Sequence, residues 1–445
     1  MTMIRNILWR IVPTVGVVLI ASSVGLAEWQ PHEVRQQNGK DPEVQLPARF
    51  QIVTESWHRV VAVPYMIYMP EKDRLLMMVG CDYPHRAYIL TSDDRGANWT
   101  DPRPAGVDKD GKPSVSLATS LVYLGNGNAL FYTDNLQIFY DFFTDEQPVN
   151  SNGQLVDTAQ KSRTGVRWFS RDYGKTWGDL VPIGPTPDGQ PFYFWDPPLV
   201  DRDQKTGKVT RIAESGYVMN EQRFHGYIRF STDEGQTWSE TIKVPQWDRA
   251  SEIGLCRAGN GDLIAGCRTD RPEGETLDHY DGLGISISKN DGHTWSTVNK
   301  IYDYGRHHPS LVLMPDGDIV MTYVVRLGYI DSKDGFRQFG VEAVVSHDHG
   351  RTWDLDHKYI LHAWVGNRKG PNAWWPSSQS TASRLLPDGS IITAFGTGYR
   401  IGEWQAPRDV GLVRWRLNTG TVNTDTTIRD AAFDSDLRNI FDPSL

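Results

Sequence analysis

Three acidic residues in the sequence have positions suited to acid–base chemistry: Asp82, Asp196 and Glu252. Each lies where a short apolar run, expected to be an inner β-strand, begins or ends. Hydrolysis of a glycosidic bond uses two carboxyl groups, one protonated and one ionised. Arg268, at the end of the run after Glu252, favours the ionised form of that glutamate. We therefore expect Glu252 to be ionised, and Asp82 or Asp196 to be the proton donor.

Other side chains could bind a substrate. His307 and His308 are adjacent on an extended segment, where neighbouring side chains point to opposite faces, so we expect at most one to reach the site. That histidine could act in acid–base work or bind a sugar hydroxyl, and packing against a neighbouring repeat is an equally good interpretation. Trp375, beside Trp374, and Tyr399 supply flat rings that suit sugar faces. No set of His, Cys and acidic residues has metal-site spacing, so we expect no metal and no cofactor.

An eight-residue pattern, Ser-x-Asp-x-Gly-x-x-Trp, occurs five times and is here called the box. In a tight turn its Asp can accept backbone N–H groups, its Gly can take a positive φ, and its Trp can bury a ring between neighbouring repeats. These roles are structural, so the box acids are poor candidates for catalysis. The copies begin at Ser92, Ser170, Ser231, Ser288 and Ser346, and the fourth has Asn290 in place of the Asp.

A second repeated feature precedes each box: two apolar runs joined by a turn, typical of a β-hairpin. Six units of about four short strands predict an all-β fold, a six-bladed β-propeller, over residues 28–417. Residues 49–54 could supply the outer strand of the last blade, next to a strand at 410–417, and residues 418–445 are expected to form a polar tail. The six predicted hairpins cover residues 66–79, 121–133, 199–213, 253–268, 311–323 and 385–395.

The blade topology predicts where a site would lie. The boxes join the third and fourth strands on one rim, so the entrance to the first strand and the exit of the second share the opposite rim. Polar residues at those places converge on the central channel and form a plausible binding cup. The candidates on that rim include Asp82, Asp196, Glu252, Arg268, His307, His308 and Tyr399.

The composition and the first residues limit the classes of protein to which this chain can belong. The 445 residues include 41 Gly, 26 Pro and 16 Trp, which argues against a helical bundle. A net charge of -9 argues against a nucleic-acid partner. Residues 1–27 resemble a secretory signal peptide, so we expect a secreted or periplasmic monomer with no membrane-spanning segment after its removal. Of three cysteines, Cys256 and Cys267 could pair, although two free thiols are the more conservative interpretation.

The boxes and the six units resemble the sialidase (neuraminidase) superfamily, whose members are six-bladed propellers with Asp-box (BNR) repeats. The resemblance covers nearly all of residues 28–417 and implies an exo-acting glycosidase. It implies that Glu252 matches the glutamate that pairs with the nucleophile. It also implies that Arg268 and Arg337 match two arginines of a carboxylate-binding triad, which could clamp a substrate carboxylate.

Two departures from the family pattern bear on activity. Ala62 stands where the family has its first triad arginine, and Gln379 or Ser380 stands where the tyrosine nucleophile is expected. Arg59 or Tyr399 could substitute for them. The leading hypothesis is an exported sialidase-like glycoside hydrolase acting on terminal acidic or modified sugars of glycans. The alternatives are a non-catalytic propeller that binds glycan or protein, and a lyase acting on an acidic polysaccharide.

Overall fold

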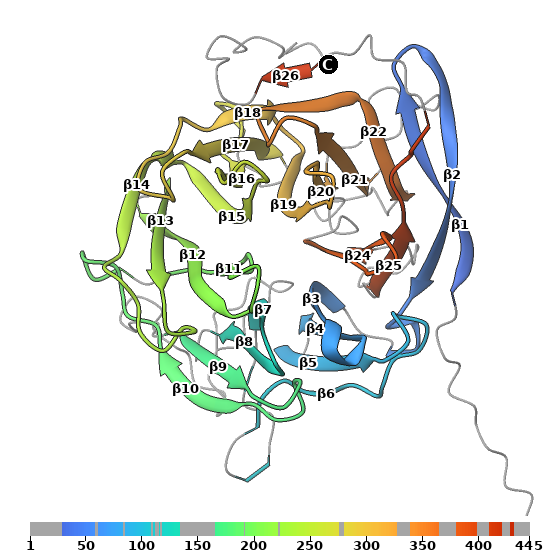
Figure 1. Cartoon of the computed structure of the whole chain (residues 1–445). Coiled ribbons are helices and arrows are strands. Elements are labelled where there is room, and N and C mark those ends of the chain that lie inside the picture. Colours follow the sequence, from blue (N-terminus) through green and yellow to red (C-terminus); the bar gives the residue numbers. More distant parts are fainter. Residues whose placement is uncertain are drawn as a thin grey trace, which may run out of the picture.

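The computed structural model describes residues 29–57, 61–82, 85–107, 110–111, 115, 118–133, 165–190, 192–220, 223–275, 280–326, 339–364, 380–397, 409–420 and 428–430. They form an almost entirely β structure whose sheets stand around a central axis (Figure 1). Within these residues, no helix combines the length and the apolar character needed to cross a membrane. The predicted signal peptide, residues 1–27, lies outside the described residues.

Four sheets have four antiparallel strands each. The first contains β3 (Val61–Met69), β4 (Arg74–Asp82), β5 (His85–Ser92) and β6 (Arg103–Pro104), with the short 3₁₀ turns η1 (Glu55–Trp57) and η2 (Pro70–Lys72) nearby in the chain. The second contains β7 (Ala118–Gly125), β8 (Asn128–Thr133), β9 (Val166–Ser170) and β10 (Gly178–Pro182). The third contains β11 (Leu199–Arg202), β12 (Val209–Asn220), β13 (Arg223–Ser231) and β14 (Ile242–Asp248). The fourth contains β15 (Ala250–Arg257), β16 (Leu263–Thr269), β17 (Gly282–Ser288) and β18 (Asn299–Tyr302).

The fifth sheet has ten strands, in the order β19-β20-β21-β22-β1-β2-β25-β24-β23, with β26 paired to β22. The structure thus confirms an all-β propeller arrangement, but the described strands form four small sheets and one large sheet instead of six separate blades. The reason is the hairpin β1–β2, which pairs with β22 on one side and with β25 on the other. The strands are β1 (Gln30–Asn38), β2 (Asp41–Ile52), β19 (Arg306–Leu313), β20 (Ile319–Val325), β21 (Phe339–Ser346), β22 (Thr352–Trp364), β23 (Thr381–Leu385), β24 (Ile391–Thr397), β25 (Asp409–Trp415) and β26 (Ile428–Asp430).

All six predicted hairpins are confirmed as antiparallel pairs: β3–β4, β7–β8, β11–β12, β15–β16, β19–β20 and β23–β24. The predicted outer strand at residues 49–54 is also confirmed, because Arg49 pairs with Arg414 and Ile52 with Gly411. Its continuation into a long hairpin was not predicted. In the predicted tail, the short strand β26 pairs with β22.

The boxes form the tight turns that their residue types suggest. In the fifth box, the Ser346 hydroxyl donates to Asp348 and accepts the Gly350 N–H, while Asp348 accepts the Thr352 N–H at 2.8 Å. Gly350 has a φ of +84°, and a Cβ there would lie 2.8 Å from a side-chain carbon of Ile264 in the neighbouring sheet. Each box Trp packs into or against a hydrophobic cluster. The boxes therefore join neighbouring sheets.

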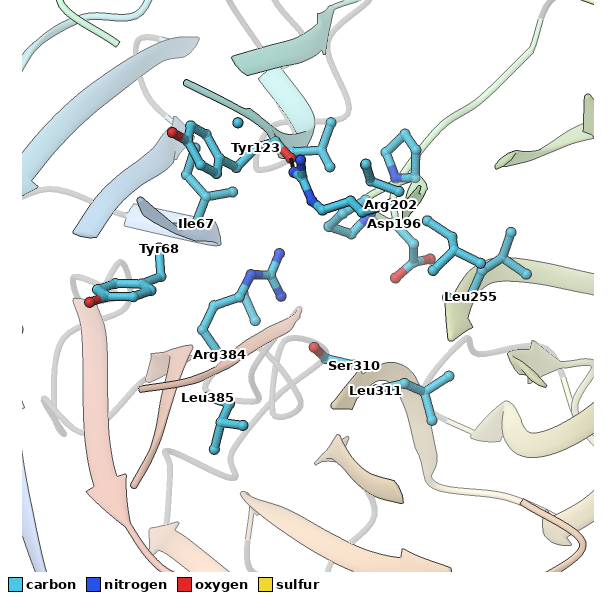
Figure 2. A pocket seen from close by; sticks show the side chains of 18 of the residues that line it. Ile67, Tyr68, Tyr123, Asp196, Arg202, Leu255, Ser310, Leu311, Arg384 and Leu385 are labelled. Atoms are coloured by element: carbon cyan, nitrogen blue, oxygen red, sulfur yellow. Dashed lines mark hydrogen bonds between the residues drawn. The ribbon is translucent and has the colours of Figure 1, made fainter. Parts of the chain in front are cut away.

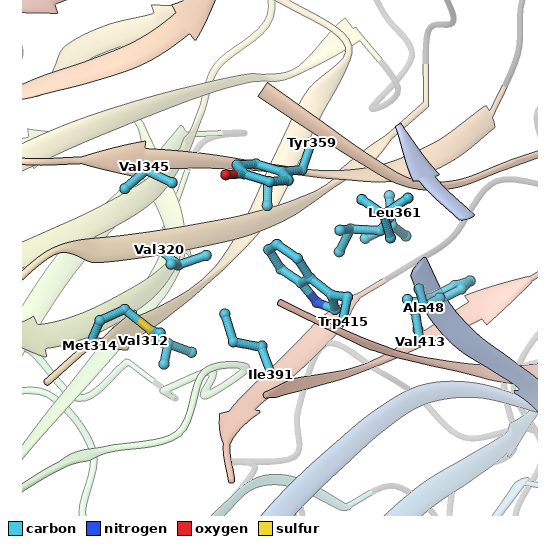
Figure 3. Close-up of a cluster of buried hydrophobic side chains, with 14 of the residues drawn as sticks. Ala48, Val312, Met314, Val320, Val345, Tyr359, Leu361, Ile391, Val413 and Trp415 are labelled. Carbon is cyan, nitrogen blue, oxygen red and sulfur yellow. The ribbon is translucent and has the colours of Figure 1, made fainter. Parts of the chain in front are cut away.

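Hydrophobic clusters pack between neighbouring small sheets and, in the ten-stranded sheet, between strands of that same sheet. The one in Figure 3 places Trp415 and Tyr359 among aliphatic side chains from β2, β19–β22, β24 and β25. Trp415 is 1% exposed and donates its indole N–H to Thr393. In the fourth sheet, Cys256 and Cys267 are buried free thiols. Around the axis, β3 contacts β7, β11 contacts β15, β15 contacts β19, β19 contacts β23, and β23 contacts β3.

Candidate active site

Glu252 lies at a β-bulge near the start of β15. The pairing of β15 with β16 shifts between Ser251 and Ile253, so Glu252 is the extra residue, and its φ is +44°. Such a conformation is strained for a residue with a Cβ, and bulges re-aim a side chain at functional sites. The residue is 7% exposed. The bulge therefore holds a buried carboxylate at the inner edge of the fourth sheet.

Arg268 determines the charge state of Glu252. Its Nη1 donates to Glu252 Oε1 at 2.6 Å, and its Nε donates to Asp281 Oδ2 at 2.7 Å. Burial by itself raises the pKa of Glu252, but the Arg268 guanidinium, with smaller contributions from His308 and His307, more than offsets burial, and the pKa lies well below the usual range. Arg268, which we predicted as a substrate ligand, is thus shared between two carboxylates. Asp281, just before β17, was not predicted as a site residue. The sequence feature that could have revealed it is an acidic residue at the end of a strand next to the strand of Arg268.

Asp196 has the opposite environment. It precedes β11, is 5% exposed, and its Oδ2 has no hydrogen-bond partner in the part of the chain that the structure describes. Burial, and next the negative charge of Glu252, raise the pKa of Asp196 well above its usual range. A Cβ on Gly254 would lie 3.7 Å from Asp196 Oδ1 and 3.1 Å from the Pro309 carbonyl oxygen, so Gly254 permits this close approach between sheets. The surroundings of Asp196 therefore favour its protonated form, whereas those of Glu252 favour the ionised form.

Both histidines lie beside these carboxyls. A register shift between His307 and Ser310, with a φ of +59° at His308, interrupts the alternation of side chains along β19. His307 Nδ1 is 3.7 Å from Glu252 Oε2, and the His308 ring meets Trp195 edge-on at 6.4 Å. Both histidines therefore lie beside the carboxyls, which a regular strand would not allow, while the expectation that at most one of them reaches the channel stays a prediction.

The two imidazoles are neutral at neutral pH. Burial lowers the pKa of His307 to about 3 and that of His308 to about 4, and the charge of Arg268 also lowers both. Neither ring nitrogen of either histidine has a hydrogen-bond partner among the described residues. These rings are therefore free to accept or donate a hydrogen bond to a ligand.

Two buried tyrosines complete the cluster, and the sequence analysis missed both. Burial, and next the charges of Asp196 and Glu252, raise the pKa of Tyr65 on β3 well above its usual range. The pKa of Tyr217 on β12 is also raised well above its usual range, by burial and next by the charge of Glu252. The Tyr65 hydroxyl has no hydrogen-bond partner among the described residues. Nothing in the sequence distinguishes these tyrosines from core residues, because both lie inside apolar strands.

Another buried acid, Glu214 on β12, belongs to a separate cluster, and the remaining predicted site residues lie outside the described part of the chain. Glu214 is held by Arg167 at 2.7 Å, by Arg229 and by the Tyr132 hydroxyl, and so belongs to a buried structural cluster. Asp82 ends β4, but its side chain is outside the described part. The remaining predicted ligands, Arg337, Trp375 and Tyr399, are outside the described residues. Among the described residues, no group of three or more His, Cys, Asp or Glu could hold a metal ion.

A central channel of about 630 Å³ runs from Asp196 to the hairpin turns at the box rim (Figure 2). Residues of β3, β7, β11, β15, β19 and β23 line it. Figure 2 shows Asp196, Ser310 and Arg384 around the open space, with Tyr123 and Arg202 nearer the turns. Asp196 thus borders both the carboxyl cluster and the channel.

Known proteins resemble this chain in structure but not in sequence. No protein-family model and no curated protein matches the sequence. A protein of unknown function from Dyadobacter fermentans is 15% identical, with a TM-score of 0.57 over 88% of this chain and 99% of that chain. The Hadza microbial sialidase Hz136 is 15% identical, with a TM-score of 0.56 over 84% and 70%. An α-L-arabinanase from Penicillium chrysogenum, complexed with arabinobiose, is 12% identical, with a TM-score of 0.50 over 86% and 98%. At such identities the likeness establishes the fold alone.

Proposed function

We propose that the protein is an exported glycoside hydrolase with Asp196 as general acid and Glu252 as general base or nucleophile. One observation carries the proposal: two neighbouring buried carboxyls have pKa values displaced in opposite directions. Such a pair divides the acid and base roles at neutral pH. The hydrogen bonds of the two carboxyls support this division. Arg268 donates to Glu252, whereas Asp196 Oδ2 has no hydrogen-bond partner among the described residues.

The chemistry follows from the two charge states. Asp196 gives its proton to the glycosidic oxygen as the bond from that oxygen to the anomeric carbon breaks. Glu252 either accepts a proton from the attacking water or attacks the anomeric carbon itself. In the second case the Asp196 carboxylate then activates the water that releases the sugar. Glu252 thereby takes a role that sialidases give to a tyrosine, which this chain lacks at the expected position.

We further propose a terminal acidic or modified sugar as the substrate. His307, His308 and Tyr65 offer unpartnered polar atoms for sugar hydroxyls. Arg337 and Arg268 are the proposed partners of a substrate carboxylate, and Trp375 and Tyr399 are the proposed ring contacts. We also propose residues 1–27 as a cleaved signal and a secreted or periplasmic monomer.

The same proposal includes a six-bladed, sialidase-like propeller. Strands β19–β22 would form one blade, β23–β25 with β2 another, and β1 would join the two into the ten-stranded sheet. Six inner hairpins support this interpretation. The structural likeness to a sialidase and an arabinanase agrees with it.

The test is hydrolysis of a panel of nitrophenyl and methylumbelliferyl glycosides that includes sialosides, uronides and arabinofuranosides. We expect cleavage of one class, and a loss of about 100-fold or more in kcat/KM for Glu252→Gln. Asp196→Asn should lose less on nitrophenyl substrates than on unactivated glycosides, because a good leaving group needs little proton donation. Glu240→Gln, at an exposed position, is the matched control. An inactive but folded wild type, or full activity in Glu252→Gln, contradicts the proposal.

A second candidate is β-elimination from an acidic polysaccharide. It is favoured by the neutral rings of His307 and His308 beside the Arg268 guanidinium. A neutral histidine would take the proton next to the uronate carboxylate, a carbon–carbon double bond would form, and the glycosidic oxygen would leave with its electron pair and be protonated by Asp196. Ultraviolet-absorbing, unsaturated products from uronate polymers would establish the lyase and reject the hydrolase.

A further inference from the structure

The box-rim end of the central channel contains a positive charge that the described residues do not neutralise. Arg384, on the innermost strand β23, lines the channel and points into its open space (Figure 2). Its one hydrogen bond to a described residue runs from Nη1 to the adjacent Ser383 carbonyl oxygen, at 2.6 Å. No described carboxylate forms an ion pair with it. Burial lowers the pKa of Arg384 to about 10, which leaves the side chain charged at neutral pH.

The other charged groups of the channel already have partners. Arg202 donates to the carbonyl oxygens of Leu124 and Tyr123, both at 2.7 Å. The Glu71 carboxylate accepts the Tyr123 hydroxyl at 2.6 Å and the Asn126 N–H at 3.2 Å. Asp196, at the far end, is protonated for the reasons given above. The lining therefore has two cations and one anion, and only Arg384 among them lacks a strong partner.

A hydroxyl donor lies on the strand beside Arg384. Ser310 Oγ accepts the Ser383 N–H at 3.1 Å, which leaves the hydroxyl hydrogen free to donate. Figure 2 shows the Ser310 hydroxyl and the Arg384 guanidinium facing the same open space. Enclosing a charge without a counter-charge is unfavourable, and a guanidinium matches the two oxygens of a carboxylate or phosphate.

We propose that the central channel binds a small oxyanion, a carboxylate or a phosphate, between the guanidinium of Arg384 and the hydroxyl of Ser310. The site lies at the box-rim end of the channel and does not depend on the proposed hydrolase. A cavity of about 630 Å³ has room for a monosaccharide acid as well as for inorganic phosphate. The same donors serve either anion, so experiment distinguishes the two sources.

The test is calorimetric titration of the full chain with inorganic phosphate, glucuronate and, as the uncharged analogue, glucose, at low ionic strength. We expect saturable binding of at least one anion and none of glucose. Arg384→Met should weaken that binding by about tenfold or more, the scale expected for loss of a charged hydrogen bond. Arg416→Met is the matched control, because Arg416 is exposed and lies outside the channel. The affinity of the Arg416→Met variant for the anion should equal that of the wild type.

Two further measurements keep the result decisive. Without anion, Arg384→Met should melt no lower than the wild type, because it removes an enclosed, uncompensated charge. Arg384→Lys keeps the charge and should retain weaker binding, which provides a folded comparison if the methionine variant is unstable. Binding of phosphate alone identifies an inorganic ligand, and binding of glucuronate alone a sugar acid. Absence of binding for both anions, or equal affinity in Arg384→Met, overturns the proposal.

Discussion

Asp196 and Glu252 are buried to a similar degree, 5% and 7% exposed, yet their charge states differ. Burial disfavours the ionised form of both carboxyls. Of the two, only Glu252 has a described guanidinium at hydrogen-bond distance. Only the ionised form of Glu252 is therefore stabilised against the unfavourable effect of burial. The ionised Glu252 then raises the pKa of Asp196 further. Arg268 is therefore the largest of the interactions that divide the two carboxyls into an acid and a base.

The buried histidines make stability depend on pH. The folded pKa values of His307 and His308, about 3 and about 4, lie below the usual value of 6.5, so the unfolded chain binds more protons. Their contribution to stability is fully present above pH 6.5 and is lost as the pH falls toward 4. By about pH 5 the loss is on the order of 2 kcal/mol for each histidine.

We therefore predict a smaller acid loss in the variant His307→Gln. Between pH 7.5 and pH 5, its free energy of unfolding in urea should fall by about 2 kcal/mol less than that of the wild type. His293→Gln, at an exposed position, should follow the wild type. Equal pH dependence in all three proteins would show that His307 titrates normally in the folded state.

At the scale of elements, two bulges do most to form the site. The bulge in β15 turns Glu252 inward, and the irregularity in β19 brings both histidines next to it. Strand ends could be predicted from apolar runs and turn residues, which is why Asp196, Glu252 and Arg268 were chosen correctly as neighbours. Bulges could not be predicted, because they depend on packing against strands distant in the sequence. The alternation rule therefore did not anticipate that both histidines lie beside Glu252.

The boxes allow a prediction at the same scale. Asp348→Ala removes the acceptor for the Thr352 N–H and hydroxyl and should lower the free energy of unfolding by about 1–3 kcal/mol. Asp348→Asn should cost clearly less, because Asn290 in the fourth box accepts the Thr294 N–H at 2.9 Å in the same way. Urea denaturation of both variants measures the difference. Equal losses would mean that the carboxylate charge, not the turn geometry, is what the box requires.

At the scale of the whole molecule, the ring closes through contacts that are remote in sequence. Residue Ile52 pairs with Gly411, and Arg35 pairs with Ile360. Repeat spacing predicted the propeller and the six inner hairpins, since each is local. It did not predict the hairpin β1–β2, because the sequence at residues 30–48 contains no repeat motif and its partners lie far along the chain. Tyr65 and Tyr217 were missed because both lie inside apolar strands, and only the packing of sheets around the axis brings β3 and β12 to the carboxyl cluster.

Packing of the third sheet against the fourth brings Asp196, at the entrance of the third sheet, to Glu252, and the proposed chemistry depends on that meeting. The most direct test is the titration of aspartate carboxyl carbons by NMR, with selective ¹³C labelling of the wild type, Asp196→Asn and Glu252→Gln. We predict one aspartate with a pKa well above the usual value near 4, absent in Asp196→Asn and lowered in Glu252→Gln. An Asp196 that titrates near 4 and is unaffected by Glu252→Gln would contradict the assignment of acid and base.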